Sequence, residues 1–341
     1  MARQGQELQA QSRSHHKRLR CFDLLMLALL LRRVGFSVLS LVLVSSCLFL
    51  VTRAIPDSPA RIVLGQDGTQ AQIVQFEHDH GLDRPVVVQY GLWLKGVLLH
   101  GSLGTSFITG RPVEPDIAAT LPVTLELVII AFVFSCVLSV IAGTLSALLR
   151  DTMLDYGVRL IAVLGVSVPG FWLALVLIMA FAVDRDWFPP GGVEPWSAGV
   201  WQHLDSIALP TFCLAIFYMA VLSRMTRSSM LEVLGQDYMR TARATGLPRR
   251  RVLVYALRNA LVPVVTVAGM SFGYMFGWAL IIEAVFNISG LSAALLTAIQ
   301  QRDFALVQGI VMVFTFIFIL ANIAADLTNA WLNPRIAAVR T

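Results

Sequence analysis

The chain has 341 residues, of which 57% are hydrophobic and only 14% are charged, and its mean hydropathy is +0.72. Soluble domains carry about 25% charged residues, so this composition excludes an ordinary water-soluble enzyme, and it also excludes collagen-like and disordered chains. The net charge of +5 would suggest nucleic acid in a soluble protein, but here the basic residues must first be assigned to the two sides of a membrane.

Six apolar blocks have the length that a bilayer requires, about 20 residues each. The sequence therefore predicts an all-α integral membrane protein with six transmembrane helices. A shorter apolar run, Leu24–Leu31, ends at Arg32-Arg33, and we expect an interfacial helix there, within an N-terminal tail of residues 1–31. The predicted spans cover residues 34–51, 127–149, 160–183, 207–223, 261–282 and 304–325.

The basic residues predict the orientation of these spans, because cytoplasmic segments are enriched in lysine and arginine. The two termini and the second-to-third and fourth-to-fifth loops hold 19 of the 26 lysines and arginines. The opposite segments hold 7 basic and 12 acidic residues. Both termini are therefore expected in the cytoplasm, and the basic character marks the cytoplasmic face, so that nucleic acid is not expected as a partner.

Two aqueous segments are long enough to carry structure. Residues 52–120 should form a small outer cap with short helices, and residues 224–260 form an inner loop. The cap contains His78-Asp79-His80, which is a weak metal pattern without a further ligand, so we expect a solvated loop and no metal site. Residues 32–336 are expected to form one transmembrane domain, followed by a cytoplasmic tail of residues 337–341.

The sequence lacks the motifs of several enzyme classes. It has no GxxxxGK[ST] phosphate loop, no HExxH and no GxSxG, so no catalytic residue is predicted. The acids nearest the membrane, Glu126, Glu283 and Asp326, lie at the ends of predicted spans, where they should contact water or helix termini. An ion-coupled transporter or channel would need a charge or filter at the midplane. It stays the first alternative, and a membrane-embedded enzyme the second.

Proline and glycine mark two of the spans. Pro169, with Gly165 and Gly170, predicts a kink in the third span, and this kink is either a gating hinge or a static feature of packing. In the fifth span glycines recur at every fourth residue, which is typical of close contact between helices. These are Gly269, Gly273 and Gly277.

The inner loop predicts two consecutive helices. The first covers Asp237 to Ala244 and ends at Gly246, before Leu247-Pro248. The second runs from about Arg249 to Asn259, and Pro263 is expected in the first turn of the fifth span. The first helix and the residues after it are strongly cationic, so a basic loop that holds anionic lipid is one interpretation.

The same stretch resembles the EAA loop of binding-protein-dependent ABC transporter permeases, and most closely the YxRTARAxGL form of the dipeptide, oligopeptide and nickel subfamily. Arg240-Thr241-Ala242 occupy the EAA positions, and Asn259 stands where many of these permeases have a proline. The stretches Gly81–Val113, Val166–Leu177, Glu283–Gly309 and Ala325–Ile336 also resemble this subfamily. The matching loop residues are Tyr238, Arg240, Thr241, Ala242, Arg243, Ala244, Gly246 and Leu247.

The resemblance implies a noncatalytic permease of the type I (MetI-like) importer architecture, located in the cytoplasmic membrane of a prokaryote. Its loop helix would be a coupling helix that docks on an ATPase subunit. The implied partners are a second homologous permease, two ATPase subunits that bind ATP and Mg²⁺, an extracytoplasmic binding protein and membrane lipid. The chain itself would bind no cofactor. The residues assigned to coupling are Asp237, Tyr238, Arg240, Thr241, Ala242, Arg243, Ala244, Gly246 and Leu247.

The resemblance also suggests that the glycine stripe of the fifth span contacts the second permease, and packing within the same chain is the competing interpretation. The expected substrates are dipeptides, oligopeptides or a related small solute such as a nickel chelate or glutathione. The sequence does not choose among them.

Overall fold

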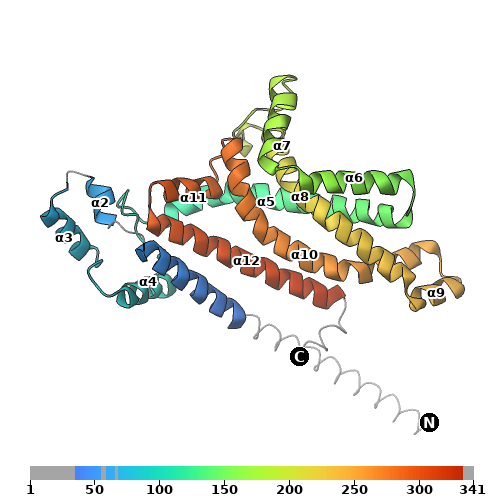
Figure 1. Ribbon diagram of the computed structural model, residues 1–341, viewed down its shortest axis with the longest axis horizontal. Coiled ribbons are helices and arrows are strands. Elements are labelled where there is room, and N and C mark those ends of the chain that lie inside the picture. Colours follow the sequence, from blue (N-terminus) through green and yellow to red (C-terminus); the bar gives the residue numbers. More distant parts are fainter. Residues whose placement is uncertain (1–34, 55–58, 66–67, 333–341) are drawn as a thin grey trace, which may run out of the picture.

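The computed structural model describes residues 35–54, 59–65 and 68–332, and over these residues the chain is helical, with no strand and one isolated bridge between Thr105 and Pro112 (Figure 1). The predicted interfacial helix and the two predicted tails lie outside the described residues. The first described helix is Gly35–Ala54. The others are α2 (Pro59–Leu64), α3 (Gln70–Asp79), α4 (Val86–His100), α5 (Glu114–Leu148), α6 (Met153–Ser167), α7 (Gly170–Leu177), the π-helix η1 (Ile178–Val183), the 3₁₀ turn η2 (Trp196–Ala198), α8 (Val200–Gly235), α9 (Asp237–Ala244), α10 (Arg249–Val285), α11 (Leu291–Gln300) and α12 (Phe304–Leu332).

Five of these helices are long and apolar enough to cross a membrane, namely Gly35–Ala54, α5, α8, α10 and α12. A sixth span is present if Met153–Ser167 and Gly170–Val183 are counted together, although they are bent by 105° at the break between them. This arrangement agrees with the predicted all-α membrane fold. It also confirms the predicted kink at Pro169, which is a complete break of the helix.

α5, α8, α10 and α12 are longer than the apolar blocks that predict them, because the helices continue into polar sequence. α5 begins at Glu114, where two acids in the first turn interact favourably with the positive end of the helix dipole. α8 extends to Gly235, and α10 begins at Arg249. Hydropathy detects the part of a helix that lies in lipid, whereas the helix itself ends at its caps.

Pro263 lies inside α10 and not in the first turn of a span, so the predicted division of this segment into two helices is wrong. A proline removes one backbone hydrogen bond and crowds the preceding turn, but packed neighbouring helices can support the chain across it. Pro122 in α5 and Pro210 in α8 are accommodated in the same way.

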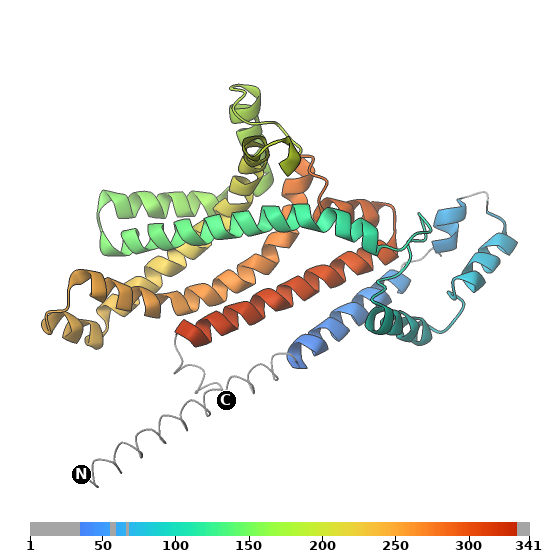
Figure 2. The same ribbon diagram turned by 180° about the vertical axis from the view of Figure 1, so that it is seen from behind.

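The bundle is built around α5, α8 and α10. Gly143 of α5 allows the close approach of α8, since a Cβ added there would lie 2.6 Å from the Ser223 carbonyl oxygen. The largest buried apolar cluster joins α5, α7, η1, α8, α10 and the segment after α10, and includes Leu127, Ile207 and Phe286. In both views α9 lies at one end of the bundle, and α2, α3, α4 and α11 lie at the opposite end (Figures 1 and 2).

Candidate functional site

α9 is a helix of 8 residues that connects α8 to α10 at one end of the bundle (Figure 1). Its bounds, Asp237–Ala244, are those that the sequence predicts. Gly246 follows with φ +76°, a left-handed conformation that glycine adopts without strain. Pro248 then caps α10 in an extended conformation. The connections on both sides of α9 are therefore short, and the helix has little freedom to move by itself.

Met239 fixes α9 to the rest of the molecule. Its side chain is fully buried and belongs to an apolar cluster with Ala147 of α5, Met230 of α8 and three residues of α10. Burying a methionine side chain stabilises a contact by about 1.5–3 kcal/mol. α9 is thus attached to the ends of three long helices. The sequence analysis did not select Met239, although it is the only long aliphatic side chain between Asp237 and Ala244.

The residues assigned to coupling form the accessible part of this region. Ala242 and Leu247 are half-buried. Arg240 pairs with Asp237 at 3.4 Å in full contact with solvent, and Arg243 Nη2 donates to the Leu234 carbonyl oxygen at 3.4 Å. The other residues assigned to coupling are exposed, and they are accessible to a partner. These are Asp237, Tyr238, Arg240, Thr241, Arg243, Ala244 and Gly246.

A buried ion pair lies at the same end of the bundle. The carboxylate of Asp155 in α6 is fully buried, and Arg227 of α8 donates to both of its oxygens, at 2.8 and 2.9 Å. Ser146 of α5 and the backbone N–H of Asp151 also donate to this carboxylate. The group joins α5, α6 and α8, and the sequence analysis missed it. The available signal was an acid and an arginine in two loops that the sequence places on the same side of the membrane.

The break between α6 and α7 contains Val168 and Pro169, both with extended backbone. The residue before a proline avoids the helical conformation, and flanking glycines weaken the helix further. Gly165, Pro169 and Gly170 all line a cavity of about 260 Å³ between this break, α8 and α10. α7 then leaves the bundle at a steep angle (Figures 1 and 2).

Aromatic side chains line the other side of this cavity. Phe217, Tyr218 and Trp278 border both it and a neighbouring cavity of about 370 Å³, which Tyr274 and Gly277 also line. The hydroxyl group of Tyr218 is buried and has no hydrogen-bond partner among the described residues. An unpaired hydroxyl in apolar surroundings is costly, so this group is available to a polar ligand or partner.

The glycine stripe of α10 is divided between two environments. A Cβ at Gly269 would lie 2.5 Å from the Cβ of Ala325, and a Cβ at Gly273 would overlap the ring of Phe318. Both glycines therefore pack against α12 of the same chain, which is the alternative that the sequence left open. Gly277 has open space around it, and of the three it alone stays available for contact with a second permease.

The acids at the outer ends of the spans serve as structural contacts. Thr124 Oγ1 donates to Glu283 Oε1 at 2.6 Å, and the N–H of Ala293 donates to Glu283 Oε2 at 2.8 Å, so this buried carboxylate caps the start of α11. Glu126 Oε1 lies 2.9 Å from His203 Nε2. The described residues contain no group of three or more metal-ligating side chains.

Comparisons with known proteins agree over nearly the whole chain. The family model described as binding-protein-dependent transport system inner membrane component matches residues 137–338, and the corresponding N-terminal model matches residues 26–128. A Brucella suis protein is 40% identical over 312 residues, which covers 91% of this chain and 99% of that protein.

Two further relatives have informative names. The oligopeptide transport system permease protein AppB of Bacillus subtilis is 36% identical over 315 residues, and the dipeptide transport system permease protein DppB of Alkalihalophilus pseudofirmus is 36% identical over 332 residues. Each match covers 91% of this chain and 99% of the relative. Among solved structures, an amino acid ABC transporter with histidines has a TM-score of 0.46 and 16% identity, over 63% of this chain and 94% of that chain.

Proposed function

We propose that this chain takes part in peptide transport. The chain belongs to the family of binding-protein-dependent transport system inner membrane components, and it is a permease subunit of an ABC importer. It forms half of a translocation path for di- or oligopeptides, and a second homologous permease forms the other half. The names of the relatives support this class of substrate.

The observation that carries the proposal is the attachment of α9. Two cytoplasmic ATPase subunits bind ATP and Mg²⁺, and one of them receives the exposed face of α9 in a groove. When the ATPases close, they push on a helix that is held through Met239 to α5, α8 and α10. The Asp155–Arg227 pair carries the same movement to α6. A flexible loop at this position would absorb the push.

The movement reaches the break at Pro169, which acts as the hinge of the gate. Gly165 and Gly170 give the hinge its freedom, and the cavity beside them, with the hydroxyl of Tyr218, belongs to the path. An extracytoplasmic binding protein delivers the substrate from the side of α2, α3, α4 and α11. Both termini lie in the cytoplasm, which the excess of basic residues on the side of α9 supports.

The docking of α9 is tested at Gly246. Gly246→Trp should abolish uptake of a radiolabelled dipeptide, because the indole would fill the open space where the ATPase seats. The matched control is Gly246→Asn, since asparagine tolerates positive φ and leaves the backbone turn intact. We expect Gly246→Asn to retain most of the uptake, with both variants inserted in the membrane at the level of the parent chain.

Normal uptake by Gly246→Trp would contradict the docking assignment. Copurification of the ATPase subunits with each variant locates the defect, because a steric block should release the ATPases from Gly246→Trp and not from Gly246→Asn. The substrate class has its own test, competition of the dipeptide by unlabelled peptides, by nickel and by glutathione. Competition by nickel or glutathione alone would overturn the peptide assignment.

A further inference from the structure

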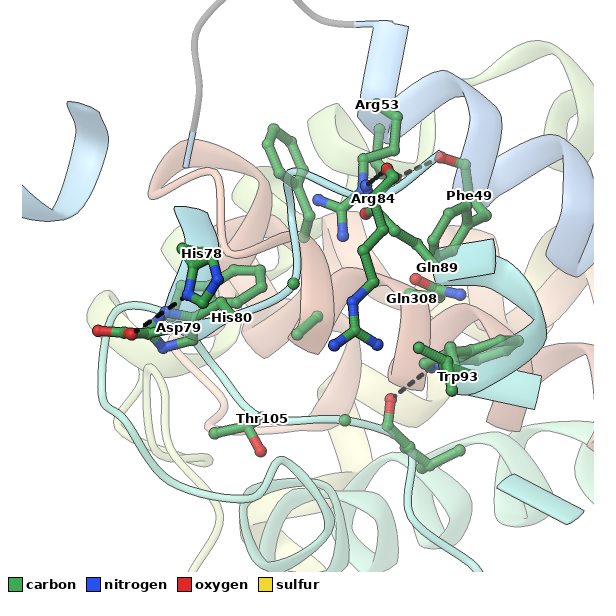
Figure 3. A pocket seen from close by; sticks show the side chains of 18 residues that line it. Phe49, Arg53, His78, Asp79, His80, Arg84, Gln89, Trp93, Thr105 and Gln308 are labelled. Carbon is green, nitrogen blue, oxygen red and sulfur yellow. Dashed lines mark hydrogen bonds and ion pairs between the residues drawn. The ribbon is translucent and has the colours of Figure 1, made fainter. Parts of the chain in front are cut away.

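A third cavity lies at the outer end of the molecule, away from the break at Pro169. Its volume is about 470 Å³, and it is lined by the end of helix Gly35–Ala54, by α3 and α4, by the loop after α4 and by the start of α12. Figure 3 shows the side chains that line this cavity, among them Arg53, Arg84, His78, Asp79 and His80. We call it the outer pocket.

The outer pocket is cationic, although the outer segments of the chain are acidic overall. Arg53 and Arg84 line it, and Asp79 is the only acid that does so. The carboxylate of Asp79 is already engaged, because Gln75 Nε2 donates to it at 2.9 Å and His78 lies 4.0 Å away. Within the described residues, no ion pair of either arginine is present.

Three of the residues that line the pocket carry buried polar atoms without a partner. Arg53 Nε and Gln308 Nε2 are both buried donors without a hydrogen-bond partner among the described residues, and Gln308 is only 5% exposed. Gln89 Oε1 is a buried acceptor without a partner among the same residues. Leaving such groups unsatisfied is unfavourable, so these side chains favour a ligand that accepts from the arginine and Gln308 and donates to Gln89. A phosphodiester oxyanion beside a hydroxyl or amine group has these properties.

The position of the pocket indicates the source of the phosphate. Arg53 is the penultimate residue of the membrane-spanning helix Gly35–Ala54, so it lies where that span meets the outer interface. α4, which forms another wall, is apolar but has no buried residue, and Val87, Leu98 and Leu99 are 82%, 73% and 68% exposed. An exposed apolar helix beside the end of a span is suited to lying among lipid headgroups.

The pocket also has a fixed floor. Trp93 Nε1 donates to the Leu103 carbonyl oxygen at 2.9 Å, and Phe49 packs edge-on against Tyr90 with 5.4 Å between ring centroids. Gly104 comes close to Trp93 with φ +124°, a conformation that favours glycine. These contacts join the first span, α4 and the loop after it, so the walls of the pocket are held in place relative to one another.

We propose that the outer pocket binds the phosphate group of an outer-leaflet phospholipid. Arg53, Arg84 and Gln308 donate to the phosphate oxygens, Gln89 accepts from the hydroxyl or amine of the headgroup, and the acyl chains lie along the exposed apolar face of α4. This proposal does not depend on the substrate of transport.

The test is lipid retention by the full-length chain, purified in detergent, delipidated and titrated with dioleoylphosphatidylglycerol in native mass spectrometry. Arg53→Gln and Arg84→Gln should each weaken binding about tenfold, as expected for the loss of one charge-assisted contact. Lys95→Gln removes an exposed charge from α4 that does not line the pocket, and it should bind as the parent chain does. Dioleoylglycerol, which has the same acyl chains without the phosphate, should bind poorly to all forms.

Equal loss of binding in Lys95→Gln, or no loss in Arg84→Gln, would overturn the proposal. Arg84 is exposed, so its substitution leaves folding intact and keeps the test decisive even if Arg53→Gln is poorly folded. Two further arms identify the source of the anion. Displacement of the lipid by millimolar inorganic phosphate, or by a dipeptide carboxylate, would show a soluble anion site and exclude the lipid assignment, whereas resistance to both supports it.

Discussion

The end of the bundle at α9 and the region around the break at Pro169 are built in opposite ways. Around α9, Met239 is fully buried and Asp155 is held by donors from two other helices and a backbone N–H. In α7, only Ala174 is buried, and Phe171, Trp172 and Leu175 are each about half exposed. One region is fixed by contacts within the chain, and the other leaves its apolar side chains to lipid or to another subunit.

This difference indicates which region would transmit the movement of the proposed transport cycle and which region would change its conformation. A segment whose contacts are satisfied internally moves as one body with its neighbours, whereas a helix with few buried contacts, joined through two extended residues, can change its angle at low cost. We therefore expect substitutions near α9 to reduce stability and coupling together, and substitutions at the break to affect transport more than stability.

The largest effect is expected at the buried ion pair. Asp155→Ala would leave the guanidinium of Arg227 partly buried without its partner, which costs about 3 kcal/mol. The control is Arg150→Ala, which removes an exposed pair with Asp151 and should cost less than about 1 kcal/mol. Heat unfolding of both variants in detergent measures the difference in their stability. Equal unfolding midpoints would contradict the conclusion that the buried ion pair stabilises the end of the bundle at α9.

A smaller loss of stability should follow from Met239→Ala. Removing this side chain opens a space among α5, α8 and α10 and should cost about 2 kcal/mol or more. Because α9 loses its anchor, dipeptide uptake per ATP hydrolysed should fall as well. Tyr238→Ala, at the neighbouring exposed position, serves as the control for stability. If both variants unfold at the same temperature, Met239 is not the anchor.

The smallest change in stability is expected at the break. Pro169→Ala restores a backbone donor and relieves the restriction on Val168, so the bend of 105° at this break should decrease toward a straighter helix. Spin labels at exposed positions of α6 and η1 would report this as a longer distance. Pro122→Ala in the continuous helix α5 should leave an equivalent pair of labels unchanged. An unchanged α6–α7 distance would mean that contacts elsewhere, and not Pro169, impose the bend.

The sequence predicted those parts of the fold whose causes are local. The length of the apolar blocks predicted the spans, and Gly246 with Pro248 defined the end of α9 and the start of the next helix. Pro169 was identified for the same reason, because the restriction that it places on Val168 acts between adjacent residues.

The parts that the sequence did not predict depend on residues far apart in the chain. Asp155 and Arg227 are separated by 72 positions, and nothing in either neighbourhood specifies the other. Pro263 was assigned to the wrong place because its tolerance inside α10 depends on the helices packed around it. The stripe from Gly269 to Gly277 predicted a close approach of another helix but did not say which one. The packing of Phe318 against Gly273 identifies that helix as α12.

The continuity of α10 gives the molecule a mechanical link from one side of the membrane to the other. Its 37 residues extend about 55 Å, beginning directly after the turn that follows α9 and ending beside the carboxylate of Glu283 that caps α11. No break interrupts it, so a tilt imposed at Arg249 would be delivered at Val285 as a displacement of α11. One continuous helix thereby connects the end of the bundle at α9 with the opposite end, without a signal having to pass from side chain to side chain.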